Sequence, residues 1–189
     1  MIEGLVEHVE RHLGPIAGEW DADPDGNVLP FVIVHYLGAA HGRAPSGTEV
    51  FSTLGLSDHG LGAHRVRIEL LMIAPAGLTP GTIPPILHHA GALPLAADAV
   101  PQLGDIYSAV SGLGEISPME DLLVLRPLYQ KPDFSPFDNG VERVHFLWLI
   151  PVHDIESEFV EAHGWPAFEQ VMWDLDVDPT DFSREAWLE

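Results

Sequence analysis

Apolar residues occur along the chain in patterns typical of β-strands. Five stretches carry such a pattern: 29–37, 48–54, 65–73, 122–125 and 144–150. The first and last read LPFVIVHYL and VHFLWLI, and unbroken runs of this kind predict strands that are buried on both faces. Residues 65–73 alternate between apolar and polar positions, which predicts a strand with one exposed face.

In other stretches, apolar residues recur three, four and seven positions apart, which is the spacing of an amphipathic helix. The first is 2–13, where Gly14-Pro15 ends the pattern. Residues 82–99 are helical in composition but contain Pro94, which predicts one or two short helices. Helices are also expected from Asp154 and from Pro166, the latter with an apolar stripe that includes Leu175. The acidic tail, 176–189, has room for a last short helix.

Loops are expected where Gly, Pro, Asp and Asn accumulate: 21–27, 55–64, 100–121 and 129–140. The resulting order is one helix, three strands, one helical region, two strands and two helices. Because the strands are grouped and not each followed by a helix, this order predicts an α+β fold in which helices flank a mixed β-sheet. No linker or repeat divides the chain, so residues 1–189 are expected to form a single domain.

The amino-acid composition excludes several kinds of catalytic and metal site and bears on which partners the chain can bind. The chain has 189 residues and no cysteine, which excludes disulfides, a thiol nucleophile, an iron–sulfur cluster and cysteine-based zinc sites. Its net charge of −21 would repel nucleic acid and anionic membranes and would attract a basic protein. The alternative is that the charge only maintains solubility or reflects an acid-rich proteome.

The start of the chain has no signal-peptide character, since residues 1–14 include acids and lack an apolar core. Residues 70–97 are free of charged side chains, but prolines and glycines interrupt them too often for a membrane-spanning helix. The sequence therefore predicts a cytoplasmic protein.

Two sequence features suggest catalysis or metal binding at first sight. Gly55-Leu56-Ser57-Asp58-His59 lacks the second glycine of a nucleophile elbow and is followed by a loop, so Ser57 and Asp58 are expected to cap a turn. His8 and His12 have helical spacing, but the glutamate between them is out of phase with a zinc-protease motif. The sequence predicts no metal and no cofactor.

The C-terminal part of the chain concentrates the acidic charge. Residues 152–189 contain eleven acids and one arginine, a local net charge of −10. Asp154, Glu156 and Glu158 follow a buried strand, where acids stabilise a helix N-terminus and Asp154 is a reasonable N-cap. The alternative interpretation is an acidic rim that binds a cationic partner.

Several segments together resemble the suppressor of fused family, over residues 28–172. The resemblance rests on these segments: Thr53 to Asp58, Arg67 to Met72, Gly104-Asp105, Pro127, Phe146 to His153, Glu156 and Glu158-Phe159. It implies an α/β sandwich that binds proteins and has no established catalytic centre. This chain is similar to the stand-alone bacterial members, for which a role as immunity proteins against polymorphic toxins is implied.

These observations favour a non-enzymatic, protein-binding domain, with a basic toxin domain as the partner to test first. The expected contact residues are Asp58, Glu69, Asp105, Asp154, Glu156 and Glu158. Two alternatives stay open. One is a metal-dependent hydrolase that draws ligands from His35, His59, His64, His153 and nearby acids, and the other is a housekeeping domain without a single partner.

Overall fold

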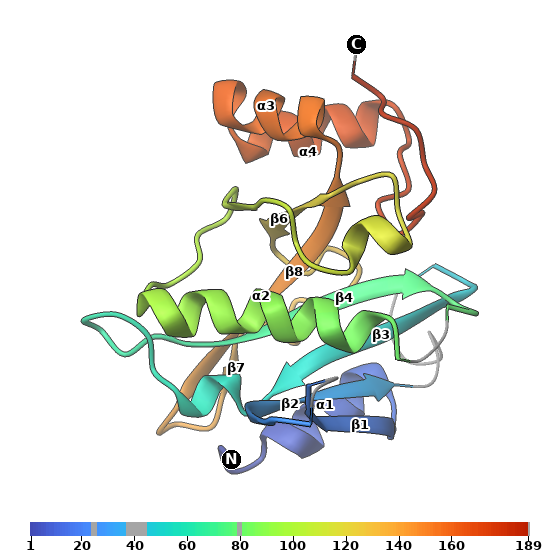
Figure 1. Cartoon of the computed structure of the whole chain (residues 1–189). Helices are drawn as coiled ribbons and strands as arrows, with labels where there is room; N and C mark the ends of the chain where they lie inside the picture. Colours follow the sequence, from blue (N-terminus) through green and yellow to red (C-terminus); the bar gives the residue numbers. More distant parts are fainter. Residues whose placement is uncertain (24–25, 37–44, 79–80, 189) are drawn as a thin grey trace.

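The computed structural model describes residues 1–23, 26–36, 45–78 and 81–188. Its strands form one mixed sheet of eight strands in the order β1-β2-β3-β4-β8-β6-β5, with β7 paired to β8 (Figure 1). The strands are β1 (Ile16–Ala22), β2 (Val28–Tyr36), β3 (Thr48–Leu54), β4 (Arg67–Pro75), β5 (Ile106–Tyr107), β6 (Asp121–Leu125), β7 (Phe137–Asp138) and β8 (Arg143–Val152). The helices are α1 (Leu5–Leu13), α2 (Ile83–Ala97), α3 (Asp154–His163) and α4 (Trp165–Asp174), with 3₁₀ turns η1 (Leu56–Asp58) and η2 (Leu113–Glu115). The predicted α+β class is confirmed.

Strand β8 connects the two halves of the sheet. Its first half, Val144 to Trp148, pairs in parallel with β4. Its second half, Trp148 to Val152, pairs antiparallel with β6 on the opposite edge. The two partners of β8 are therefore offset along it, with β4 beside its beginning and β6 beside its end.

The alternation of side chains along β8 builds a core on each face of the sheet. Phe146, Trp148 and Ile150 point to the face covered by α1, α3 and α4. Leu147 and Leu149 point to the opposite face, which α2 covers (Figure 1). Because both faces are buried, the apolar run in the sequence is continuous rather than alternating.

The structure adds a strand that the sequence pattern did not predict. β1 occupies Ile16–Ala22, where exposed and half-buried residues alternate at the edge of the sheet. Its first five residues have no predicted element, and its last two residues, Asp21 and Ala22, lie in a predicted turn. The short strands β5 and β7 likewise lie in stretches expected to be loop or turn.

Helix α2 is a single helix, one of the two predicted arrangements, and Pro94 lies inside it without interrupting it. Pro94 lies in the last turn, where it removes one backbone hydrogen bond. Ile83, Ile86 and Leu87 are fully buried against the sheet, and this tertiary packing stabilises the helix beyond its intrinsic propensity.

The C-terminal segment 176–188 packs against the domain instead of forming the expected short helix. Thr180 and Phe182 are each only 2% exposed, and the segment runs along the side of the molecule and returns to the C-terminus at the top (Figure 1). Among the helices of the described residues, none combines the length and the apolar character needed to cross a bilayer.

Candidate functional site

The acids predicted to contact a partner occupy three separate parts of the fold. Asp58 and Glu69 lie in η1 and β4, Asp105 immediately before β5, and the other three in the first turns of α3. Glu69 and Glu156 are both 0% exposed, so a partner cannot reach them in this structure. We therefore reassign these two residues to roles inside the fold.

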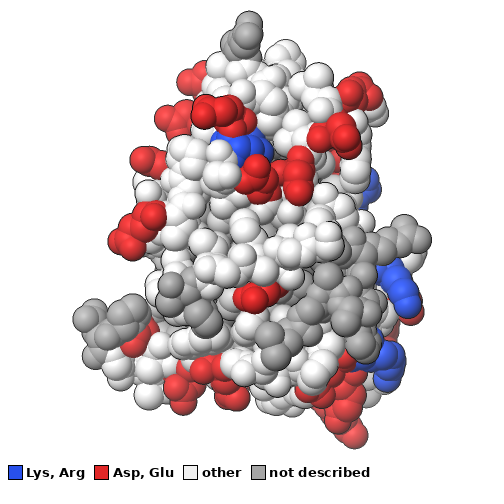
Figure 2. All heavy atoms as spheres, turned by 90° about the vertical axis from the view of Figure 1, so that its right-hand side faces the viewer, with Lys and Arg blue, Asp and Glu red and all other residues white. Residues whose placement is uncertain are grey.

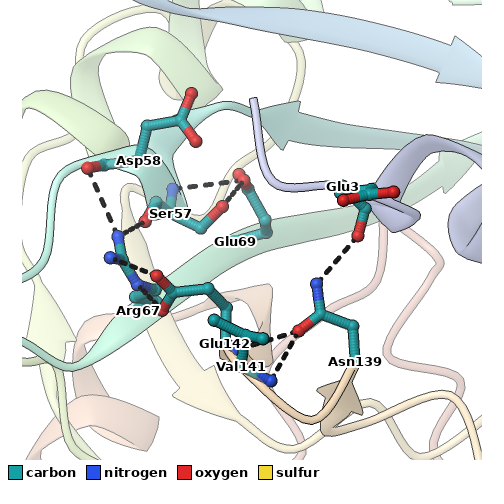
Figure 3. A network of polar contacts seen from close by, with 8 residues as sticks. All are labelled: Glu3, Ser57, Asp58, Arg67, Glu69, Asn139, Val141 and Glu142. Atoms are coloured by element: carbon teal, nitrogen blue, oxygen red, sulfur yellow. Dashed lines mark hydrogen bonds and ion pairs between the residues drawn. The ribbon is translucent and has the colours of Figure 1, made fainter.

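Glu69 accepts hydrogen bonds from donors on β3 and η1, and Figure 3 shows those from Ser57. The Thr53 hydroxyl donates to Oε2 over 2.6 Å, while the Ser57 hydroxyl and the Gly55 amide donate to Oε1 over 2.7 and 2.9 Å. Burial raises the pKa of Glu69, and the bonds from Thr53, Ser57 and Gly55 lower it in part. The carboxylate thereby holds the η1 turn, in which Gly55 has a φ of +97° that favours glycine.

Ser57 has a structural role in this network. It is 0% exposed, and its hydroxyl donates to Glu69 rather than to a histidine base. This geometry agrees with the sequence-based rejection of a nucleophile elbow. The predicted turn is present as η1, but Ser57 contributes to it through Glu69.

Arg67 connects η1 to the turn after β7 (Figure 3). Its Nη1 donates to the Ser57 carbonyl over 2.8 Å, and its Nη2 donates to Glu142 Oε1 over 2.9 Å. Asp58 is the last residue of η1, the turn that Arg67 contacts. Its side chain is 37% exposed, and its Oδ2 is 2.7 Å from the Met1 amine. Asp58 is therefore accessible at the surface.

Asp105 is exposed and stabilises its own turn. Its Oδ2 accepts a hydrogen bond from the backbone N–H of Gln102 over 2.8 Å. Its charge also contributes to a raised pKa of Tyr107, for which burial is the larger cause. At Gly104, next to Asp105, an added Cβ would lie 2.9 Å from the Trp165 ring at the start of α4, and Asp105 stays a predicted contact.

The residue that caps the N-terminus of α3 is not the one predicted from the sequence. The N-cap residue is His153, not Asp154, and the Glu156 side chain accepts from the His153 amide over 3.0 Å. Glu156 also binds Arg184 of the C-terminal segment, whose Nη2 is 2.6 Å from Oε2. Asp154 and Glu158 are exposed, and their separation by four residues places them on one helix face.

The histidines considered for a hydrolase are dispersed. His35 pairs with Glu49 at 3.1 Å, His59 contacts the Pro30 carbonyl, and His153 contacts the Arg184 carbonyl, while His64 is exposed. In the part of the chain that the structure describes, no three His, Asp or Glu residues are grouped as a metal site would require. The described residues therefore offer no metal site that would support the hydrolase alternative.

The exposed acids of α3, α4 and the C-terminal segment form what we call the acidic C-terminal surface. Figure 2 shows acidic side chains in the upper part of the molecule, at the height of α3 and α4 in Figure 1, around a basic side chain, and further acids along the lower edge. The acids of this surface are Asp154, Glu158, Glu161, Asp174, Asp176, Asp178, Asp181 and Glu185. The one arginine of residues 152–189, Arg184, pairs internally with Glu156, while Arg126, which follows β6 and is 57% exposed, pairs with Glu169 of α4.

Two large apolar side chains are exposed at the end of α4, within the acidic C-terminal surface. Trp173 is 52% exposed and Leu175 is 55% exposed, and they alternate with Asp174 and Asp176. The sequence pattern includes Leu175 in the apolar stripe of this helix, but α4 ends at Asp174 and Leu175 lies beyond it. The exposure of Trp173 excludes a place in the core.

Comparisons with known proteins identify related folds. A family model described as Suppressor of fused protein (SUFU) matches residues 31–185. A protein assigned as a SUFU homologue from Neisseria gonorrhoeae matches with a TM-score of 0.72 at 18% identity, covering 99% of this chain and 96% of that one. No curated protein matches the chain.

Two further structures share the fold. The Sufu–Fu complex matches with a TM-score of 0.69 at 16% identity, over 97% of this chain and 91% of that one. Drosophila Suppressor of Fused matches with a TM-score of 0.66 at 16% identity, over 94% of this chain. This chain spans 48% of the Drosophila protein.

Proposed function

Because the chain belongs to the suppressor of fused family, we propose that it is a protein-binding domain that acts by holding its partner and not by catalysis. A protein of the same fold has been crystallised as the Sufu–Fu complex. The observation that carries the proposal for this chain is the acidic C-terminal surface, with its two exposed apolar side chains.

Charge supports a basic partner. The acidic C-terminal surface has eight exposed acids: Asp154, Glu158, Glu161, Asp174, Asp176, Asp178, Asp181 and Glu185. Arg184 does not offset them at the surface, because its side chain is only 9% exposed and pairs with Glu156. A surface of one sign accelerates encounter with a partner of the opposite sign and disfavours other acidic proteins.

The apolar side chains support binding rather than solubility alone. A surface that only maintained solubility would have no need of an exposed Trp173 beside Leu175. Tryptophan is enriched among the residues that contribute most to binding energy, and charged rims surround such anchors. We place Trp173 and Leu175 at the centre of the contact, with Asp174 and Asp176 beside them.

The finer form of the proposal is that the partner is a basic toxin domain that this chain neutralises. This form rests on the likeness to stand-alone members of the family and on the negative charge. If the toxin acts on nucleic acid, acids at the contact would occupy the surface that otherwise binds phosphates. Asp58 and Asp105 are proposed as additional contacts on separate parts of the fold.

The test is affinity capture from the lysate of the native cell at low salt. The bait is the full chain, compared with D154K/E158K and with the control E19K/D21K, whose exposed acids lie on the edge strand β1. Both double variants change the net charge equally. We expect one stoichiometric basic protein on the unmodified chain and on the control, and its loss on D154K/E158K. Equal capture by all three, or capture of no stoichiometric protein, would overturn the proposal.

A further inference from the structure

The turn between β7 and β8 contains the dipeptide Asn139-Gly140, in which an amide carbonyl and a main-chain nitrogen can react with each other. The nitrogen of the second residue can close a ring onto the asparagine side chain, and the bulk of that second residue limits the reaction. Gly140 has no side chain and a φ of +84°, and a Cβ added there would have nothing within 4 Å. Both residues are exposed, so water reaches them.

Asp138 contacts the N–H group that has to lose its proton in such a reaction. The Gly140 N–H donates to Asp138 Oδ1 over 2.8 Å. A carboxylate within about 2.6–3.2 Å of the donor atom is in position to act as a general base. The nitrogen of Gly140 is therefore held beside a proton acceptor.

Two other N–H groups polarise the carbonyl that would be attacked. Asn139 Oδ1 accepts hydrogen bonds from the N–H of Glu142 over 2.8 Å and from the N–H of Val141 over 3.0 Å (Figure 3). Such donors stabilise the negative charge that develops on the oxygen during attack, as an oxyanion hole does. The main-chain bond from the Asn139 N–H to the Glu142 carbonyl, over 3.2 Å, fixes the turn that presents them.

The nitrogen that would leave connects the turn to the N-terminal segment. Asn139 Nδ2 donates to the Glu3 carbonyl over 3.0 Å, and the two residues are 136 positions apart in the sequence (Figure 3). Replacing this NH₂ group by a carboxylate oxygen would remove the donor and place a negative charge against the carbonyl oxygen. The residues before α1 would then lose this attachment.

We propose that Asn139 is a self-modification site, at which the turn converts asparagine to aspartate and isoaspartate without an enzyme and releases the residues before α1. The Gly140 nitrogen bonds to Cγ of Asn139 while its proton passes to Asp138. The bond between Cγ and Nδ2 breaks, and ammonia leaves with that proton. Water then opens the cyclic imide. Attack at Cγ gives aspartate, and attack at the main-chain carbonyl carbon gives isoaspartate. Water is the only co-reactant, and no atom changes its oxidation state.

The experiment incubates the freshly purified full chain at physiological temperature and neutral pH and follows Asn139 by peptide mapping with mass spectrometry. The reference without a fold is the synthetic peptide PFDNGVER, residues 136–143. Asn27, the only other asparagine, is an internal control because the β-branched Val28 follows it. D138N keeps an acceptor for the Gly140 N–H but removes the base. D133N is its matched control, since Asp133 is also exposed and precedes β7.

We expect Asn139 to convert at least about threefold faster in the folded chain than in the peptide, because the turn holds the reacting groups together. Asn27 should convert at least about tenfold more slowly than Asn139. D138N should slow the conversion at least about tenfold without lowering the melting temperature, and D133N should leave the rate unchanged. A smaller acceleration by the fold, or an unchanged rate in D138N, would overturn the self-modification.

The release of the N-terminal residues is tested on N139D, which carries the aspartate product. We expect the amide hydrogens of residues 2–8 to exchange faster with solvent in N139D than in the unmodified chain, since local opening governs exchange. Exchange in α2, which covers the other face of the sheet, should not change. Equal exchange of residues 2–8 in both proteins would overturn the release.

Discussion

Replacing Arg184 by Met tests how the C-terminal segment is attached to the domain. The Arg184 side chain is 9% exposed and Glu156 is fully buried. Arg184 Nη2 donates to Glu156 Oε2 over 2.6 Å and to the Pro151 carbonyl over 3.0 Å. Methionine retains most of the length of the side chain, but it leaves the Glu156 carboxylate buried without its cation.

Removing one partner of a buried ion pair costs about 3–5 kcal/mol. Glu156 retains the hydrogen bond from the His153 amide, so we expect R184M to lower the free energy of unfolding by about 3 kcal/mol. E156Q should also destabilise, because it leaves Arg184 without a counter-charge. The double variant R184M/E156Q removes both charges and keeps an acceptor for His153, so it should recover most of the loss, to within about 1 kcal/mol of the unmodified chain.

The assay is urea unfolding followed by tryptophan fluorescence, with limited chymotrypsin digestion as a local probe. Phe182 is 2% exposed, and it should become a cleavage site in R184M and be protected again in the double variant. If each single variant costs less than about 1 kcal/mol and the two effects simply add, the ion pair does not hold the segment and the reasoning is wrong.

Three further predictions follow from individual contacts. Burial raises the pKa of Glu69 from its ordinary value of 4.5, so the folded state binds a proton more readily than the unfolded state. The unfolding free energy of the unmodified chain should therefore fall relative to that of E69Q as the pH rises from about 5 to about 8. A difference between the two proteins that stays constant with pH in urea titrations would contradict this. A Cβ at Gly91 would lie 2.6 Å from Cζ of Phe31, whereas one at Gly81 would have nothing within 4 Å. G91A should therefore cost about 1–3 kcal/mol in thermal unfolding and G81A much less, and equal costs would refute the contact. W173S should weaken capture of the basic partner without lowering the melting temperature, because Trp173 is 52% exposed; a loss of both would indicate a structural role instead.

The positions of the main strands were largely predictable because their signal is local, but the exposed face predicted for residues 65–73 was wrong, since β4 is buried on both faces between its two ends. The runs at 29–37 and 144–150 contain the information about burial on both faces within themselves. By contrast, β1 was missed because its alternation includes Gly18 and the half-buried Trp20, a weak apolar signal at an edge. The continuity of α2 through Pro94 depends on packing against the sheet, which a local pattern does not contain.

The candidate site was only partly predictable, for a related reason. Glu69 and Glu156 look like surface acids in the sequence, but their partners Ser57 and Arg184 are 12 and 28 residues away. One signal was available: with His153 as the N-cap, Glu156 falls at the third helical position, where a glutamate bonds back to the cap.

The central claim is that this chain binds a basic partner through its acidic C-terminal surface. The most direct measurement is the association rate constant with the captured partner at about 50 and about 500 mM salt. For the unmodified chain and for E19K/D21K we expect the rate to fall at least about tenfold over this range, because salt screens the steering field. For D154K/E158K we expect a slower rate at low salt and a smaller salt effect. A rate independent of salt, or the same rate for all three proteins, would contradict the account.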